Sequence, residues 1–192
     1  MILDNRLFFS ATQRNKDCIG DVLSRIIKKN GSILEIGSGS GEHGVFFQKR
    51  FPEIIWQTTD PNFLHRKSII SWIEYEKLHK RTPQPVELDV ENTYCKIPLN
   101  FILPIQGIVS INLIHVAMWN CTISLFKGAG ELLKRGQFLI LYGPFKIGNN
   151  HISQSNYLFD NSLKIQNDLR GIRNLEEVTD EAKKLAFDKK IL

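Results

Sequence analysis

Residues 33–44 read ILEIGSGSGEHG, in which three apolar residues and a carboxylate lead into a stretch with a glycine at every second position. A short buried strand that runs into a glycine-rich turn and then a helix is typical of the first strand-to-helix connection in an open parallel sheet. Glycine suits such a turn because the backbone bends sharply and a ligand can approach without a Cβ atom in the way. The stretch therefore predicts a fold class and a ligand site together.

The residues on either side of this stretch alternate between helix-like and strand-like patterns. Upstream, apolar pairs recur every four residues from Cys18 to Ile27 and predict a helix that the Asn30-Gly31 pair ends. Downstream, the patterns predict a helix over 42–51, a strand over 54–59, a helix over 62–80 with Leu64, Ile69, Trp72 and Ile73 inward, a short strand over 86–88, a strand over 107–114, a helix over 120–135 and a buried strand over 137–142. This alternation predicts an α/β fold with a doubly wound, mostly parallel Rossmann-like sheet, in a single domain over residues 1–192.

The pattern changes after Gly143, where a long polar loop begins. Long loops in compact domains are more often functional than idle, so we expect residues 143–174 to form a substrate-side insertion. Within it, Ser153 or Ser155 is placed to cap a helix that continues to residue 166. Asn174, followed three residues later by a glutamate, resembles a capping box at the start of a last helix over 175–187.

Composition excludes several classes of protein. A chain of 192 residues with 42% hydrophobic and 23% charged residues is the size of one globular domain. No apolar run approaches the roughly 18 to 20 residues that cross a bilayer, so we expect a cytoplasmic protein without membrane contact. The net charge of +5 comes without the aromatic-basic interleaving of RNA-binding proteins, so nucleic acid is not indicated. The cysteines, Cys18, Cys95 and Cys121, lack any CxxC spacing; we expect reduced core thiols and no metal site.

The glycine stretch can be interpreted in two ways. Gly39, Gly41 and Gly44 spell GxGxxG, the dinucleotide fingerprint, and Asp60 at the end of the next strand would then bind ribose hydroxyls. In that case, however, Glu42 would lie in the first turn of the helix and compete with the pyrophosphate for the positive end of the helix dipole. An NAD-linked oxidoreductase is therefore the alternative and not the main hypothesis.

The second interpretation starts at Glu35 and gives E-x-G-x-G-x-G. A carboxylate at the end of the first strand suits a ligand that carries an ammonium group and no phosphate, as the amino-acid end of S-adenosylmethionine does. Asp60 would take the ribose, and Asp89, after the third strand, would accept from the exocyclic amine of adenine. The predicted cofactor-binding residues are Glu35, Gly37, Ser38, Gly39, Ser40, Gly41, Asp60, Asp89 and Asn112.

Longer motifs resemble one particular family. The segments LEIGSGSGEHGVFF (34–47), WQTTDPN (56–62), INLIHVAMW (111–119), LYGPFKIGNNHISQSNYLFDNSL (141–163) and GIRNLEEV (171–178) are similar to the DUF938 family, also called UPF0585, of methyltransferase-like proteins. The resemblance runs from about Arg14 to about Ala186. It implies a seven-strand class I methyltransferase fold that binds S-adenosylmethionine and releases S-adenosylhomocysteine, with an acceptor that is not established.

The chain departs from the family pattern at two places. Leu169, Arg170 and Asn174 stand where members carry an aromatic residue and GIRDLE, and the sequence stops at FDKKIL, before the strand hairpin with which members end. We therefore expect a sheet without the C-terminal strand hairpin, whose edge beside strand 137–142 has lost its pairing partner.

Candidate catalytic residues lie after the later strands. Methyl transfer needs mainly in-line placement of the acceptor, plus a base when the acceptor must lose a proton. Asn112, His115 and Tyr142 are the candidates for these roles. Arg14 and Asn15, which belong to the family pattern, would fold over the cofactor as a lid. Residues 1–14 would form an N-terminal lid or arm. The remaining substrate-side candidates are Trp119, His151, Ser155, Asn156 and Asp160.

These observations predict an S-adenosylmethionine-dependent methyltransferase that acts on a small molecule. The alternatives are the NAD-linked oxidoreductase and a non-catalytic cofactor-binding or scaffolding module with the same fold. The sequence leaves the oligomeric state open.

Overall fold

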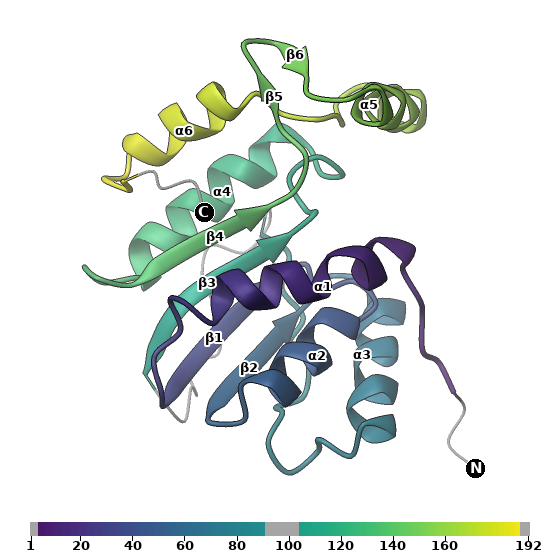
Figure 1. The fold of residues 1–192 in the computed structure, drawn as a ribbon, viewed down its shortest axis with the longest axis vertical. Coiled ribbons are helices and arrows are strands. Elements are labelled where there is room, and N and C mark those ends of the chain that lie inside the picture. Colours follow the sequence, from purple (N-terminus) through teal and green to yellow (C-terminus); the bar gives the residue numbers. More distant parts are fainter. Residues whose placement is uncertain (1–3, 91–103, 189–192) are drawn as a thin grey trace. The chain divides into compact units, whose positions relative to one another are not determined.

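The computed structural model describes residues 4–90 and 104–188. Its strands are β1 (Gly31–Ile36), β2 (Ile54–Thr59), β3 (Ile105–Ile111), β4 (Phe138–Tyr142), β5 (Lys146–Ile147) and β6 (Asn150–His151). Its helices are α1 (Ser10–Leu23), α2 (Glu42–Arg50), α3 (Phe63–Tyr75), α4 (Trp119–Leu132), α5 (Gln154–Gln166) and α6 (Leu175–Lys183). The alternation of helices and strands predicted from the sequence is confirmed (Figure 1).

The first four strands form one sheet in the order β2-β1-β3-β4, and β1 pairs in parallel with both of its neighbours. All six residues of β1 are buried, as expected for a strand that is covered on both faces. β2 lies at one edge of the sheet and β4 at the other, so within the described residues β4 has the unpaired edge that the sequence predicts. Because it is an edge strand, β4 is only half-buried, and the prediction of a buried strand there is wrong.

Two helix predictions need correction. α1 begins earlier than its apolar pairs indicate and ends at Leu23, so Ile26 lies in the turn that follows the helix and Ile27 lies just after that turn. In α3 the side chain of Asn62 accepts a hydrogen bond from Leu64 N at 2.8 Å, which places Leu64 in the first turn, 64% exposed. Ile69, Trp72 and Ile73 of the same helix are buried as predicted.

The predicted strand over 86–88 is reduced to a single parallel bridge between Val86 and Thr59. β3 is also shorter than predicted: it ends at Ile111 because Asn112 adopts a left-handed backbone conformation with φ 56°. The last two helices begin where predicted. Ser153 caps α5 by accepting from Asn156 N at 3.1 Å, whereas Asn174 precedes α6 without capping it through its side chain.

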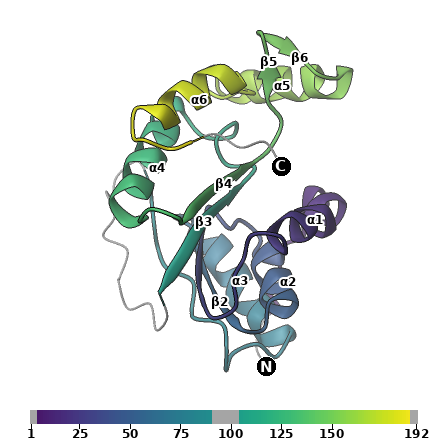
Figure 2. The ribbon, with the colours of Figure 1, turned by 60° about the vertical axis from the view of Figure 1, so that its left-hand side comes forward.

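The chain divides into two compact units. Unit 1 holds the described chain up to Asp89, the segment that ends at Ser110, and Leu133–Ile140. In unit 1, α2 contacts both α1 and α3, and Figure 2 shows these helices together on one side of β1 and β2. Unit 2 holds Ile111–Leu132 and the chain from Leu141 onward. In unit 2, α6 packs on α4, and α5 contacts β6 of the short antiparallel hairpin formed with β5.

Cys121 is buried as predicted, but Cys18 is exposed on α1, and Cys95 lies outside the described residues. No described helix combines the length and the apolar character that crossing a bilayer requires. Residues 4–90 and 104–188 contain no group of three His, Cys, Asp or Glu side chains that could hold a metal ion.

Candidate functional site

The loop between β1 and α2 turns sharply, as its glycines predict. Gly37, Gly39 and Gly41 have φ values of 70°, 56° and 88°, in the left-handed region that favours glycine. Two hydrogen bonds fix the loop against β2: Ser38 N donates to Thr59 O at 2.8 Å, and Thr59 N donates to the side-chain Oγ of Ser38 at 3.2 Å. The loop therefore closes over the carboxyl ends of β1 and β2.

The glycines of this loop serve different purposes. A Cβ atom on Gly41 would lie 2.7 Å from a side-chain carbon of Ile69, and one on Gly44 would lie 3.0 Å from a carboxylate oxygen of Glu35. Those two positions need glycine for packing inside the protein. A Cβ atom on Gly39 would instead meet the ring of Phe9, at 3.0 Å. The backbone at Gly39 is thus covered by a side chain from the N-terminal segment and not by the core.

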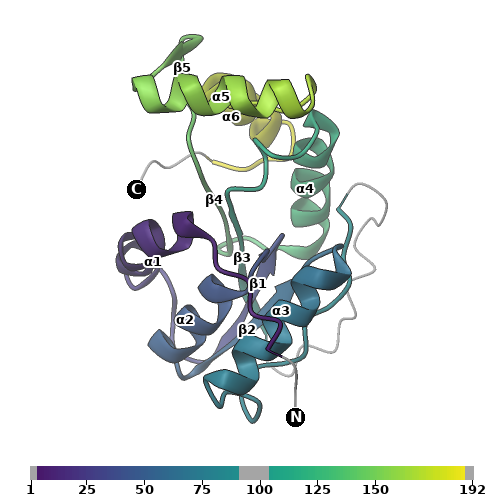
Figure 3. The ribbon, with the colours of Figure 1, turned by 90° about the vertical axis from the view of Figure 1, so that its right-hand side faces the viewer.

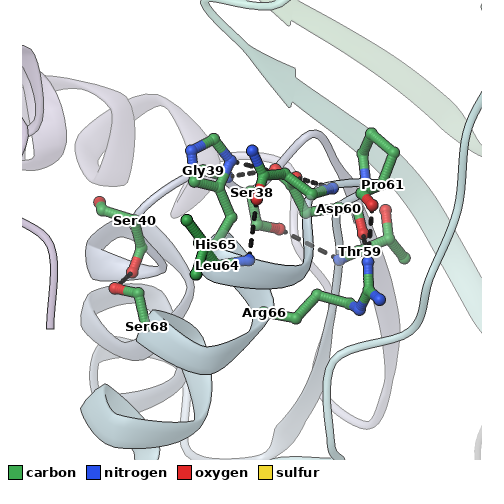
Figure 4. Close-up of polar contacts among 11 residues, drawn as sticks. Ser38, Gly39, Ser40, Thr59, Asp60, Pro61, Leu64, His65, Arg66 and Ser68 are labelled. Atoms are coloured by element: carbon green, nitrogen blue, oxygen red, sulfur yellow. Dashed lines mark hydrogen bonds and ion pairs between the residues drawn. The ribbon is translucent and has the colours of Figure 1, made fainter. Parts of the chain in front are cut away.

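Asp60 ties the loop to the segment after β2 (Figure 4). Its Oδ2 accepts a hydrogen bond from Gly39 N at 2.9 Å, and its Oδ1 accepts from Asn62 N at 2.8 Å. The Nδ1 atom of His65 lies 3.1 Å from the same Oδ1. A carboxylate can accept about four hydrogen bonds, so three contacts leave capacity for one more donor, such as a ligand hydroxyl.

Glu35 lies beneath the loop and not on its surface. It is the next-to-last residue of β1 and only 1% exposed. Its Oε2 accepts from Trp56 Nε1 at 2.9 Å, and Ser38 supplies a further side-chain hydrogen bond. Burial raises the pKa of Glu35 to about 7, although these hydrogen bonds act in the opposite direction. The carboxylate is therefore poised to change its charge near neutral pH.

Glu42 is the first residue of α2 and is buried. Its Oε2 accepts from Phe9 N at 2.7 Å and from Ser40 Oγ at 2.9 Å, and its Oε1 accepts from Gln13 Nε2 at 2.8 Å. The carboxylate thus binds the N-terminal segment in the first turn of the helix. A phosphate at this helix end would meet a negative charge that is already in place.

The other predicted residues of unit 1 are more dispersed. Asn15 is buried between α1 and α2, where its Oδ1 lies 2.8 Å from His43 Nε2, so it packs within the unit. Burial, with the nearby Lys16 cation, lowers the pKa of His43 to about 4. Arg14 is exposed on α1, and Asp89 is half-buried after the Val86 bridge.

Unit 2 brings together three predicted residues at the ends of β3 and β4. Asn112 N donates to Tyr142 O at 2.8 Å, and a Cβ atom on Gly143 would lie 3.6 Å from Asn112 Oδ1 and 3.1 Å from His115 Nδ1. His115 is 2% exposed, its ring meets Phe159 edge-on, and its Nδ1 has no hydrogen-bond partner among the described residues. Burial, with the nearby Arg173 cation, lowers the pKa of His115 to about 4, so the imidazole is neutral at pH 7.

A second cluster in unit 2 is centred on Asp160, which is fully buried. Its Oδ2 lies 2.9 Å from His151 Nε2 and 2.8 Å from Lys164 Nζ, and its Oδ1 accepts from Ile172 N at 2.7 Å. Burial alone would raise the pKa of Asp160, but these donors and Lys146 lower it to about 2. This cluster joins the β5–β6 hairpin, α5 and the segment before α6.

The remaining substrate-side candidates do not join this cluster. Asn156 donates its backbone N–H to the cap of α5, and Ser155 lies exposed with its hydroxyl 2.9 Å from that of Ser153. Trp119 is half-buried at the start of α4, with the guanidinium of Arg173 5.7 Å from its ring centre.

Sequence reasoning missed Phe9, His65 and Arg173. Arg173 donates to the backbone oxygens of Ile114, Ala117 and Leu169 and so fixes the segment that carries His115. Its position in the GIRNLEEV motif was an available signal. Phe9 and His65 belong to none of the motifs that the sequence offers. Only the structure shows that Phe9 lies against Gly39 and that His65 contacts Asp60.

Comparisons with known proteins identify the family and the fold. The family described as "Protein of unknown function (DUF938)" matches residues 6–191. Among solved structures, an O-methyltransferase family protein from Burkholderia thailandensis matches with a TM-score of 0.75 and 12% identity over 94% of this chain and 53% of its own. Human N-acetylserotonin methyltransferase, solved in complex with SAM, matches with a TM-score of 0.69 and 11% identity over 93% of this chain and 48% of its own.

An O-methyltransferase family 2 protein from Planctomyces limnophilus, in complex with apigenin, matches with a TM-score of 0.71 and 17% identity, over 92% of this chain and 52% of its own. The chain therefore spans about half the length of these three proteins. At such identities the likeness shows the fold alone, which is that of the methyltransferases.

Proposed function

The chain belongs to the DUF938 family, and from that premise and its methyltransferase fold we propose that it transfers a methyl group from S-adenosylmethionine to a small-molecule acceptor. The observation that carries the proposal is the hydrogen bond from Gly39 N to Asp60 Oδ2. It holds a carboxylate next to a backbone without a side chain, at the carboxyl ends of β1 and β2. Parallel sheets bind their ligands at this end of the strands.

The residues present fit the proposed cofactor. Asp60 has capacity for a ribose hydroxyl, and Gly39 lets a ligand approach its backbone once Phe9 moves. Glu35 is too deeply buried to meet an ammonium group directly in this conformation, so we assign it a supporting role. Its charge lies below the loop and would attract a cation bound above it. Glu42 opposes a pyrophosphate at the start of α2, which favours this cofactor over NAD.

The acceptor would be held by residues of unit 2. S-adenosylmethionine, when bound, supplies an electrophilic methyl group on a sulfonium. The protein's own contribution is then mainly orientation, which Asn112 and Tyr142 would provide. His115 is neutral at pH 7 but buried, so it would act as a base only for an acceptor that displaces Gly143 from its ring. The Planctomyces limnophilus protein matched above was solved in complex with apigenin, and the binding of that small molecule supports a small-molecule acceptor here.

Calorimetric titration of the protein with S-adenosylmethionine, S-adenosylhomocysteine and NAD tests the proposal. We expect binding of both sulfur compounds in the micromolar range and none of NAD. Asp60→Asn tests whether the carboxylate takes part in binding, because it keeps the shape of the side chain and removes its charge. Asp168→Asn makes the same substitution in unit 2 and is the matched control. NAD binding alone would support the oxidoreductase. Binding of the sulfur compounds without methyl transfer to any small-molecule extract would support a scaffolding module.

A further inference from the structure

We propose that Phe9 is a movable cover over the cofactor loop, whose ring must swing away from Gly39 before a ligand can reach that backbone. The inference rests on the proposed function, since it concerns the same loop. It adds a residue that controls access to the loop, and this residue lies in the N-terminal arm, defined here as Asp4–Phe9.

The backbone of the arm is fixed along α3, beside which it runs in Figure 3. Leu7 N donates to Ser68 Oγ at 2.8 Å, and Leu7 O accepts from Trp72 Nε1 at 3.0 Å. Phe9 N donates to Glu42 Oε2 at 2.7 Å. Ser68 in turn donates to Ser40 O at 2.6 Å, so the arm and the glycine loop share one hydrogen-bond chain.

Arg6 fastens the outer end of the arm. Its guanidinium carbon lies 3.6 Å from the ring centre of Tyr75 and 4.9 Å from that of Trp72, which is close enough for cation–π attraction. Asp4 pairs with the same guanidinium through two contacts of 2.9 Å. These anchors do not involve Gly39, so the arm remains attached when the Phe9 side chain moves.

The ring of Phe9 is held much less firmly than its backbone. It is part of a residue that is 41% exposed, it rests on Gly39, and it meets the ring of His65 edge-on with centres 5.8 Å apart. An aromatic pair of this kind stabilises the covered position of the ring only modestly. Displacing the ring should therefore weaken the binding of a ligand by about two- to tenfold. A rotation about the Phe9 side chain would uncover Gly39 and the contacts of Asp60 with His65 together.

Titration of the full chain with S-adenosylhomocysteine tests the inference by comparing the wild type with Phe9→Ala and with Phe63→Ala. Phe63 is 59% exposed at the start of α3 and serves as the matched control. We expect Phe9→Ala to bind about two- to tenfold more tightly and Phe63→Ala to bind like the wild type. Should Phe9→Ala fail to fold, Phe9→Leu keeps the apolar bulk, loses the edge-on contact, and is expected to change affinity in the same direction by less.

Hydrogen exchange of the Leu7 and Phe9 amides, measured with and without S-adenosylhomocysteine, gives an independent readout. We expect these amides to keep their protection, because the ring moves and the backbone stays. Weaker or unchanged binding by Phe9→Ala, when the wild type binds, would overturn the inference and leave the proposed function standing. Absence of binding by wild type and variant alike would overturn the proposed function, and the inference with it.

Discussion

Replacing Glu35 by Gln should stabilise the protein at alkaline pH. The carboxylate is fully buried in β1 and receives hydrogen bonds from Trp56 and Ser38, and burial raises its pKa from 4.5 to about 7. Glutamine has nearly the same shape, carries no charge at any pH, and can still accept from the Trp56 N–H. The substitution therefore removes a charge that burial disfavours and keeps the packing.

The sign and the size follow from proton linkage. The folded state holds its proton up to about pH 7, whereas the unfolded chain loses it near pH 4.5. Wild-type stability is therefore greatest below the unfolded pKa and falls as pH rises through the folded pKa. Each pKa unit corresponds to about 1.4 kcal/mol, so between pH 5 and pH 8.5 the wild type should lose about 2 to 3 kcal/mol from this group. The Glu35→Gln protein should keep this stability over the same pH range.

Urea denaturation followed by tryptophan fluorescence, from pH 5 to pH 8.5, measures this difference. Glu53→Gln, the same substitution at an exposed site, controls for the loss of one negative charge. We expect the stability gained by Glu35→Gln relative to wild type to grow with pH and that of Glu53→Gln to stay near zero. A Glu35→Gln protein that is less stable than wild type at pH 8.5, or whose difference does not depend on pH, would refute the reasoning.

Three further predictions concern packing and buried polar groups. Gly44→Ala should destabilise the protein by about 1 to 3 kcal/mol through overpacking. Gly130→Ala on α4, where a Cβ atom would make only ordinary van der Waals contact with Leu185, should stabilise it by about 0.5 to 1 kcal/mol. Urea midpoints that move in the opposite order would contradict the glycine geometry. Asn15→Ala leaves the buried His43 ring without its Asn15 partner, so the free energy of unfolding should fall by about 1 to 3 kcal/mol in thermal unfolding. An unchanged melting temperature would show that the contact does not stabilise the protein. Asp160→Asn removes the charge that accepts from Ile172 N and Lys164, so it should cost about 1 to 3 kcal/mol and speed hydrogen exchange of the Ile172 amide; unchanged exchange there would exclude Asp160 as its anchor.

The fold was predictable because periodicity reports which face of each element is buried. β2 has the bounds predicted for it, 54–59, since short apolar runs bounded by turn residues have few alternatives. The errors fall where a local contact overrides the pattern. Leu64 looks inward by spacing, but the Asn62 cap starts the helix so that Leu64 faces solvent. Strand 86–88 needs a neighbour along its whole length, and only Val86 pairs.

The sequence indicates which residues lie near the glycine loop, but it does not indicate which residues contact them. Sequence position alone puts Glu35 and Asp60 near the ends of neighbouring strands, and the structure brings both to the glycine loop. The sequence could not reveal that Trp56 and Ser38 form hydrogen bonds with Glu35, because those contacts depend on side-chain directions across the sheet and the loop. The cover by Phe9 was equally hidden, since its neighbour Gly39 lies thirty positions away in sequence.

A buried glutamate whose ionisation is expected to weaken the fold calls for a reason other than stability. Proteins retain destabilising charges at functional sites when a ligand interacts with the charged form. A cation bound above the loop would favour the ionised form of Glu35, because opposite charges at short range lower the pKa of an acid. Affinity for S-adenosylmethionine should then rise with pH between 6 and 8 in the wild type and stay flat in Glu35→Gln. If calorimetry shows the same pH dependence in both proteins, Glu35 serves the loop structurally, and the ammonium group is held by other residues.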